Sequence, residues 1–430
     1  MLIKHADINR WFWKWHIIAG LITLPIMLLL AITGIIYLFK ADYNDARYQT
    51  VRFINTPINA TEKRPQRASY QAQLDSVAQH YPHPIMQVFL PEEKNRTTGF
   101  RLHGKGHTRN MVYTNPYTGE ITGAIEQKQT LMYSVRKLHG ELLLSTPGTL
   151  VVELVASWFI VLIFTGIYIW WPVKKFSAAG FFTIRIHKGR RLFWRNIHAV
   201  AGFWLSLFML LILAGGMPWT NIFGSQLKWV QEKTHTGYPT HWRSIKGLSS
   251  QPISQTAPLS LDAIIGIAQA QQLPGKLSIK LPVGEHGVFS IANRSLWLRD
   301  QQVLHIDQYS GDIIKQHTWT DVGILMEMRQ IAMRLHQGEY GFANWLAVLL
   351  ITLVFTLSTA AGLISYLVRK PKGRWGLPSV PAEFRVDGAL AVGIIILALM
   401  FPTFGISLLL LWLYEYVATL LKHKKVVTTQ

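Results

Sequence analysis

The stretch Trp15-His16-Ile17-Ile18-Ala19-Gly20 begins the first long apolar run of the chain and decides the interpretation of the rest. Its pattern His-x-x-Ala-Gly recurs at residues 197–202, where His198 again stands at the start of an apolar run. A further glycine lies eighteen residues past each histidine, at Gly34 and Gly216. An imidazole inside a membrane helix is costly unless it is partnered or bound to something. A single histidine could be satisfied by a carbonyl or a headgroup, but a repeated one favours ligand binding.

Apolar runs of membrane-crossing length are the main feature of the chain. We predict spanning helices at about 13–39, 148–171, 197–219 and 342–369. Each run reaches across about 30 Å of hydrocarbon at about 1.5 Å per residue. The first lacks a small-residue cleavage site and is therefore expected to be retained. A fifth apolar region is too long for one upright helix. We expect it to form a hairpin of about 388–401 and 404–420, with one tilted helix as the alternative.

The distribution of positive charge predicts the orientation of these spans. Residues 172–195 carry seven Lys or Arg and residues 369–374 carry four, which places both loops on the cytoplasmic side. The N-terminus follows the same rule, and the polar segments at about 41–138 and 221–335 then lie on the opposite side of the membrane. Much of the net charge of +20 flanks the spans, where it meets membrane lipids. We therefore do not expect nucleic acid as a partner.

The chain contains no cysteine. This excludes disulfides, thiolate catalysis, iron–sulfur clusters and covalent haem attachment through C-x-x-C-H. Any bound cofactor must therefore be held by His, Met, Tyr or carboxylate side chains.

The repeat extends well beyond the first histidine motif. Residues 112–121 match 304–313, and Leu138-His139 corresponds to Leu335-His336. The predicted fold class is an integral membrane α-helical bundle with two extracytoplasmic α+β domains. It arises by internal parallel duplication, with a pseudo-two-fold axis along the membrane normal. The first repeat covers 1–180, the second 181–372, and residues 373–430 form the C-terminal apolar hairpin and a basic tail.

This symmetry predicts two sites stacked across the membrane. His16 and His198 should meet near the cytoplasmic face, and His139 and His336 near the opposite face. Pairing within one half is excluded because about 30 Å of bilayer separates its two histidines. Two ligands are too few for a closed zinc site, whereas haem b needs only two axial ligands and an apolar slot. We therefore predict two haem b groups, with haem iron held by the four histidines.

Arginines near the two faces are candidate partners for haem propionates. They are Arg10, Arg191 and Arg195 on the cytoplasmic side, and Arg136, Arg329 and Arg334 on the other side. Membrane topology and headgroup contact explain the same residues equally well.

Several motifs together resemble the PepSY-associated transmembrane proteins of bacteria. They are the turn Asn115-Pro116-Tyr117-Thr118-Gly119-Glu120, residues 165–172, and the His-x-x-Ala-Gly and Leu-His elements. The resemblance covers residues 1 to about 372. The chain departs from the pattern in its second soluble segment, which has Asp307-Gln308-Tyr309-Ser310 at the corresponding turn. This leaves open whether both soluble segments bind the same thing.

The resemblance implies an activity. Some members of that family are inner-membrane reductases that hold two b-type haems and release iron from ferric siderophores in the periplasm. It implies PepSY-like soluble domains, the same four histidines as ligands and a haem-dependent ferric-siderophore reductase. The chain has no G-x-G-x-x-G motif, so a cytoplasmic flavin or nicotinamide enzyme, or membrane quinol, would donate the electrons. The alternatives are a non-redox membrane protein whose PepSY domains bind peptide or regulate a partner, and a transporter.

Overall fold

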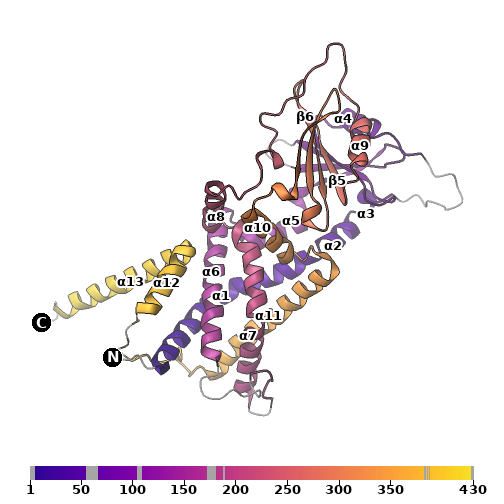
Figure 1. Cartoon of the computed structure of the whole chain (residues 1–430). Coiled ribbons are helices and arrows are strands. Elements are labelled where there is room, and N and C mark those ends of the chain that lie inside the picture. Colours follow the sequence, from indigo (N-terminus) through magenta and orange to yellow (C-terminus); the bar gives the residue numbers. More distant parts are fainter. Residues whose placement is uncertain are drawn as a thin grey trace.

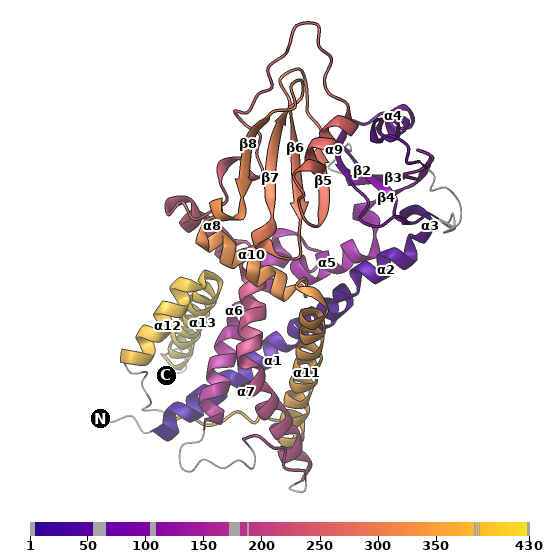
Figure 2. The ribbon, with the colours of Figure 1, turned by 45° about the vertical axis from the view of Figure 1, so that its right-hand side comes forward.

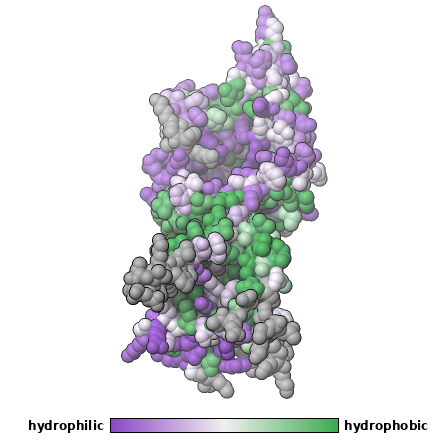
Figure 3. Space-filling view, turned by 90° about the vertical axis from the view of Figure 1, so that its left-hand side faces the viewer, coloured by the Kyte–Doolittle hydropathy of each residue, from purple (hydrophilic) through white to green (hydrophobic). Residues whose placement is uncertain are grey.

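Four long helices form one end of the molecule and an antiparallel sheet forms the other (Figure 1). The structure is a computed structural model that describes residues 5–54, 66–103, 109–171, 181–186, 189–381, 384, 386 and 388–427. The long helices are α1 (His5–Leu38), α6 (Thr146–Trp170), α7 (Arg190–Gly216) and α11 (Gly341–Arg369). All four are long and apolar enough to cross a membrane. On the face drawn in Figure 3, hydrophobic side chains gather in the middle of the molecule, below a hydrophilic upper part. The chain is therefore a membrane protein, as predicted.

The apolar C-terminal region forms two helices rather than one tilted helix. These are α12 (Gly388–Met400) and α13 (Pro402–Val427), which meet at Phe401. The hairpin is fixed to α6 by polar contacts, since Ser157 Oγ lies 3.1 Å from Thr403 Oγ1 and the Trp158 indole donates to Ser407 Oγ at 3.1 Å. Buried polar groups need such partners, so these contacts set where the hairpin packs.

The only acidic residue deep in a predicted span, Glu153, serves a neighbouring helix. Its two carboxylate oxygens accept from the backbone amides of Ile222 and Phe223, at 2.8 and 2.9 Å. These amides open α8 (Ile222–Lys233), where the first N–H groups have no partner within the helix. The helix dipole also favours a negative charge there. Glu153 is therefore a helix cap, which explains a buried carboxylate without an ion pathway.

The sheet has eight strands in the order β4-β3-β2-β1-β5-β6-β7-β8, and every neighbouring pair is antiparallel (Figure 2). The first half of the chain provides β1 (Ile85–Phe89), β2 (Thr98–His103), β3 (Arg109–Thr114) and β4 (Ile121–Glu126). The second half provides β5 (Lys276–Lys280), β6 (Val288–Arg294), β7 (Gln302–Asp307) and β8 (Ile313–Thr318).

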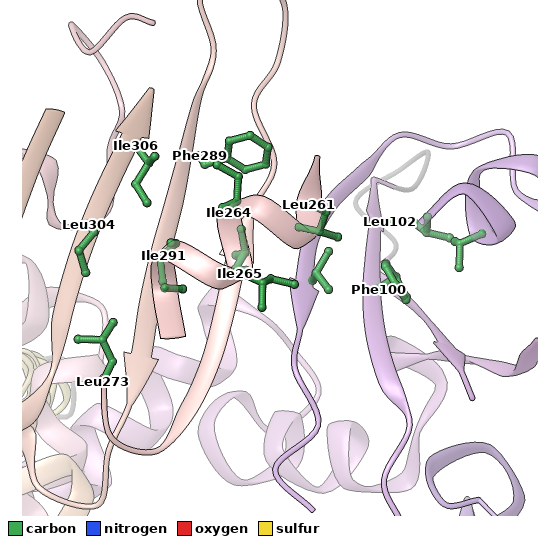
Figure 4. Close-up of a cluster of buried hydrophobic side chains, with 14 of the residues drawn as sticks. Phe100, Leu102, Leu261, Ile264, Ile265, Leu273, Phe289, Ile291, Leu304 and Ile306 are labelled. Carbon is green, nitrogen blue, oxygen red and sulfur yellow. The ribbon is translucent and has the colours of Figure 1, made fainter. Parts of the chain in front are cut away.

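The four strands of one soluble segment and the four of the other join edge to edge in one continuous sheet. Strand β1 pairs with β5, with Val88 opposite Ile279. This pairing removes two open strand edges, each of which would expose unpaired backbone groups. Helices α4 (Tyr70–His80) and α9 (Leu261–Ala270) share a buried core on the same face of the sheet (Figure 4). Asp262 accepts from the first two amides of α4, which ties the two halves together.

The shorter helices connect the sheet to the spans. They are α2 (Lys40–Arg47), α3 (Gln49–Arg52), α5 (Leu131–Glu141) and α10 (Ile324–His336). Single 3-10 turns lie at Gln127–Gln129, Met217–Trp219, Thr240–Trp242, Leu298–Asp300 and Trp319–Asp321. Helices α5 and α10 lie between the sheet and the spans (Figures 1 and 2). Glu339 joins the start of α2 to β6 through ion pairs with Lys40 at 3.2 Å and Arg294 at 2.9 Å. Internal duplication stays a prediction, although both halves place a span before four strands and a span after them.

Candidate functional site

Four histidines lie in two pairs of nearly identical geometry. His16 on α1 and His198 on α7 have ring centroids 6.3 Å apart and ring planes at 62°. His139 on α5 and His336 on α10 have centroids 6.2 Å apart and planes at 61°. Each pair takes one histidine from each half of the chain, so the residues come together as the repeat predicts. We call them the inner pair (His16, His198) and the outer pair (His139, His336).

Every one of these rings packs against a glycine of a neighbouring helix. A Cβ placed on Gly166, Gly362, Gly34 or Gly216 would lie 3.2, 2.9, 3.4 and 3.6 Å from the rings of His16, His198, His139 and His336, respectively. A side chain at Gly362 or Gly166 would crowd the imidazole, whereas a Cβ at Gly34 or Gly216 would make ordinary van der Waals contact. The glycine eighteen residues past each repeated histidine thus contacts a histidine of the other pair. Helix α1, for example, carries His16 near one end and contacts the His139 ring near its other end.

Backbone carbonyls fix the tautomer of one histidine in each pair. His198 Nδ1 lies 2.9 Å from the Ser358 carbonyl oxygen, and His336 Nδ1 lies 2.8 Å from that of Ile212. A carbonyl oxygen only accepts, so both Nδ1 atoms carry hydrogen. The other ring nitrogen, Nε2, is left with a lone pair.

Threonine hydroxyls hold the other histidine of each pair. His16 Nδ1 lies 2.9 Å from Thr165 Oγ1, and His139 Nδ1 lies 3.0 Å from Thr33 Oγ1. Each hydroxyl donates its one hydrogen to a carbonyl of its own helix, from Thr165 to Val161 at 2.9 Å and from Thr33 to Leu29 at 2.7 Å. The hydroxyl oxygens must then accept from Nδ1. All four Nε2 atoms therefore have the lone pair that a metal requires.

Sequence reasoning missed these threonines, although a signal was present. Thr33 directly precedes Gly34 and Thr165 directly precedes Gly166. In each Thr-Gly dipeptide the threonine hydroxyl hydrogen-bonds to a histidine ring, and the glycine packs against the same ring.

The outer pair is also held in its neutral form. Burial, together with the neighbouring His336, lowers the pKa of His139 to about 4, and the hydrogen bond toward α1 only partly opposes this. Burial likewise lowers the pKa of His336. Metal ligation needs a deprotonated imidazole nitrogen, so neither ring has to lose a proton near pH 7.

The spacing of the rings fits two imidazoles on opposite sides of one metal. With metal–nitrogen bonds of about 2.0–2.1 Å, the two ring centroids would be about 6–6.5 Å apart. The observed separations of 6.3 and 6.2 Å fall in this range. Within the described part of the chain, no three His, Asp or Glu side chains are grouped to hold a metal ion. This donor set suits a metal whose other ligands belong to a macrocycle, as in haem.

The inner pair opens into a cavity of about 490 Å³, which is a normal size for a ligand pocket. Both histidines line it, with Gly20 and Gly202 in its wall. Its aromatic and cationic lining includes Trp13, Trp170, Phe203, Arg191, Arg195 and Arg369. Arg369 Nη2 and Trp170 Nε1 are buried, and neither has a hydrogen-bond partner among the described residues. An apolar slot with unused donors at one end fits a flat apolar group that carries acidic substituents.

The six predicted arginines have different outcomes. Arg191 and Arg195 line the cavity, Arg10 is exposed on α1, and Arg136 is exposed beside the Tyr133 ring. Arg329 is buried, donates to the Pro218 carbonyl at 2.9 Å and lies over Trp219. Arg334 is buried and donates to the carbonyls of Ser295 and Leu296 at 2.8 and 2.6 Å. Backbone carbonyls thus engage one nitrogen of Arg329 and one of Arg334, and a propionate contact of either residue stays a prediction. Arg369 was missed, since its sequence position indicated only topology.

The family model described as "PepSY-associated TM region" matches residues 13–369, which include both histidine pairs and the whole sheet. No curated protein matches the chain significantly.

Proposed function

This chain belongs to the family of PepSY-associated transmembrane proteins, and on that premise we propose that it is a di-haem b reductase of the bacterial inner membrane. It passes electrons from the cytoplasmic side to a ferric siderophore, or another ferric chelate, in the periplasm. The observation that carries the proposal is the presence of two histidine pairs with the same geometry and the same tautomer at opposite ends of the spans. Haem b at each pair would supply a one-electron Fe(III)/Fe(II) couple.

The placement of the pairs supports transfer across the membrane. His16 contacts Gly166, and eighteen residues further along α1 Gly34 contacts His139. At about 1.5 Å per residue the two pairs are roughly 27 Å apart along this helix. The region between them is apolar: Met27 and Val155 are buried there, and the rings of Phe159 and Phe355 lie 5.1 Å apart. Met27, Phe159 and Phe355 also line the inner cavity, so its wall toward the outer pair is apolar.

The surrounding residues would hold and tune the cofactor. Hydrogen bonds from Nδ1 to a carbonyl or hydroxyl fix each imidazole and raise its basicity toward the metal. At the inner pair, Arg191, Arg195 and Arg369 would pair with the acidic substituents. Gly20 and Gly202 have no side chains, so the cavity wall there would leave room for the flat ring system.

The positive-inside rule supports the proposed direction of electron flow. The basic segments after α6 and at the end of α11 favour the cytoplasmic side for the inner pair. The sheet and the outer pair then face the periplasm, where a ferric chelate would accept the electron. A cytoplasmic flavin or nicotinamide enzyme, or membrane quinol, would be the donor.

Haem content is the first test. A pyridine haemochrome assay on the purified full chain should give about two haems per chain. His198→Ala and His336→Ala should each remove one, and together they should remove both. The control is His80→Ala, which removes an exposed imidazole on α4 and should keep two. Wild-type protein that stays colourless under ample haem supply would refute the proposal in favour of a peptide-binding or regulatory membrane protein.

Electron delivery is the second test. Protein in vesicles is reduced with dithionite, the excess is removed, and a ferric siderophore is added on the sheet side. We expect reoxidation of the haem bands together with release of ferrous iron. Both should be lost in His336→Ala and kept in His80→Ala. Haem that stays reduced with every ferric chelate would contradict the assigned acceptor.

A further inference from the structure

The sheet has a second face, opposite α4 and α9, whose centre is cationic. Side chains alternate between the two faces of a strand. Val88 on β1 lies in the core beneath the helices, so its neighbour Gln87 points to the other face. Gln87 pairs with Arg101 on β2 and with Lys280 on β5. These three side chains therefore form one row across the junction of the two halves.

Other elements pack on this face toward its two ends. At the β4 end, Val51 of α3 lies against Gly123. At the β8 end, Trp242 packs with Val303 and Trp319. The row at the centre lies between these two covers. We call this face of the central strands β2, β1 and β5, together with Arg243 beside Lys280, the seam.

Neutral groups contact each of the three cations at the seam. The Arg101 guanidinium lies 4.7 Å from the Phe89 ring centroid and donates to the Gln87 side chain at 2.8 Å. Lys280 Nζ donates to the Arg243 carbonyl at 3.4 Å, and the Arg243 guanidinium lies 4.6 Å from the centre of the Tyr238 ring.

Nearby cations of the same domain are matched by carboxylates, whereas two at the seam are not. Lys276, on the same strand as Lys280, pairs with Glu92 at 2.7 Å. Among the residues that the structure describes, no carboxylate forms an ion pair with Lys280 or Arg243. The seam therefore carries positive charge that an anionic ligand could neutralise.

The positive potential extends toward the outer pair. Burial lowers the pKa of Lys280, and the charges of Arg101 and Arg243 lower it further. Burial lowers the pKa of Arg329, and Arg243 adds to this effect. Arg329 belongs to α10, two helical turns before His336. A ligand held at the seam would thus lie on the side of the sheet that faces the ligand-bearing helix.

We propose that the seam, through Arg101, Lys280 and Arg243, binds a ferric chelate that is both anionic and aromatic, such as a tris-catecholate complex. Iron(III) with three doubly charged catecholates has a net charge of −3. Guanidinium and ammonium groups would bind its oxygens, and the rings of Phe89 and Tyr238 would contact its aromatic faces. This inference rests on the proposed function and names its substrate class. Uncharged tris-hydroxamate chelates would bind weakly.

The test uses redox-inert gallium(III) chelates, so that binding is measured apart from electron transfer. The full chain in neutral-lipid nanodiscs is titrated with gallium tris-catecholate and with uncharged gallium tris-acetohydroxamate. We expect the trianion to bind more tightly and to lose affinity as salt is raised. Lys280→Gln and Arg243→Gln should each weaken the trianion about tenfold, as the loss of one charged hydrogen bond does. Lys94→Gln, which removes an exposed cation from the β1–β2 loop, is the matched control and should bind as wild type.

Three results would overturn the inference. One is equal affinity for the two chelates, or no binding of either. The second is a trianion affinity that both seam variants leave unchanged. The third is displacement of the trianion by equimolar inorganic phosphate, which would indicate a general anion site. If the gallium results are as expected but the iron complex is never reduced, the proposed reductase function fails while the binding site stands.

Discussion

The hydroxyl of Thr165 should control how tightly the inner pair holds its cofactor. Its oxygen accepts from His16 Nδ1 at 2.9 Å while its hydrogen goes to the Val161 carbonyl. Thr165→Val keeps the shape of the side chain but removes this acceptor. A buried N–H left without a partner costs about 1–3 kcal/mol. At about 1.4 kcal/mol per factor of ten, haem affinity should fall roughly 5- to 150-fold. Loss of a hydrogen-bond partner of a metal ligand typically costs about 10- to 100-fold, which agrees.

The measurement needs one site at a time. In a His336→Ala background only the inner pair is complete, and haem is titrated into the apoprotein while the Soret band is followed. The matched control is Thr23→Val, because Thr23 is also a buried span threonine and its hydroxyl bonds to the Ala19 carbonyl of its own helix at 2.8 Å. We expect weaker binding for Thr165→Val and little change for Thr23→Val. Equal dissociation constants for the two variants would refute the reasoning that fixes the tautomer of His16.

Three further changes probe other parts of the structure. Gly362→Ala puts a Cβ about 2.9 Å from His198 Nδ1 and should leave about one haem per chain in the haemochrome assay; a full complement would show that the ring has room to move. Glu153→Gln removes the charge that caps α8 and should lower the free energy of unfolding by about 1.5–3 kcal/mol, measured by thermal unfolding in detergent; an unchanged midpoint would count against the cap. Burial would raise the pKa of Glu339, but its two cationic partners outweigh burial and hold it below the ordinary value of 4.5. Its stabilisation is therefore present above pH 4.5 and lost as pH falls through the folded pKa, so acid unfolding should be less steep in Glu339→Gln than in wild type.

The sequence predicted the spans and the pairing of histidines because both depend on signals that survive along the chain. Apolar length is a local property, and the repeat with its axis brings His16 to His198 without any knowledge of packing. The union of the two soluble segments was not predictable in this way. Strands β1 and β5 have the composition of ordinary strands, and nothing in their sequences indicates that these two edges pair with each other.

The sequence cannot separate the possible roles of the arginines, for a physical reason. A guanidinium near a membrane face can meet lipid, an acidic cofactor group or a backbone carbonyl, and all three look alike in sequence. The contacts of Arg334 with the carbonyls of Ser295 and Leu296 come from a turn far along the chain, so no local pattern indicates them. Arg369 shows the reverse case, because it is distinguished from its basic neighbours by a buried nitrogen that lacks a partner among the described residues.

Helix α1 contributes to both histidine pairs, and this constrains insertions and deletions in it. The helix carries His16 of the inner pair and Gly34, which contacts His139 of the outer pair. Helix α7 likewise carries His198 and Gly216, which contacts His336. Inserting a single residue between His16 and Gly34 would turn one end against the other by about 100° and move it by about 1.5 Å. Either His16 or Gly34 would then face the wrong neighbour. The distance between the two histidine pairs is therefore fixed by the number of residues from His16 to Gly34. An adaptation of the protein to a thicker bilayer would have to lengthen α1 outside this segment.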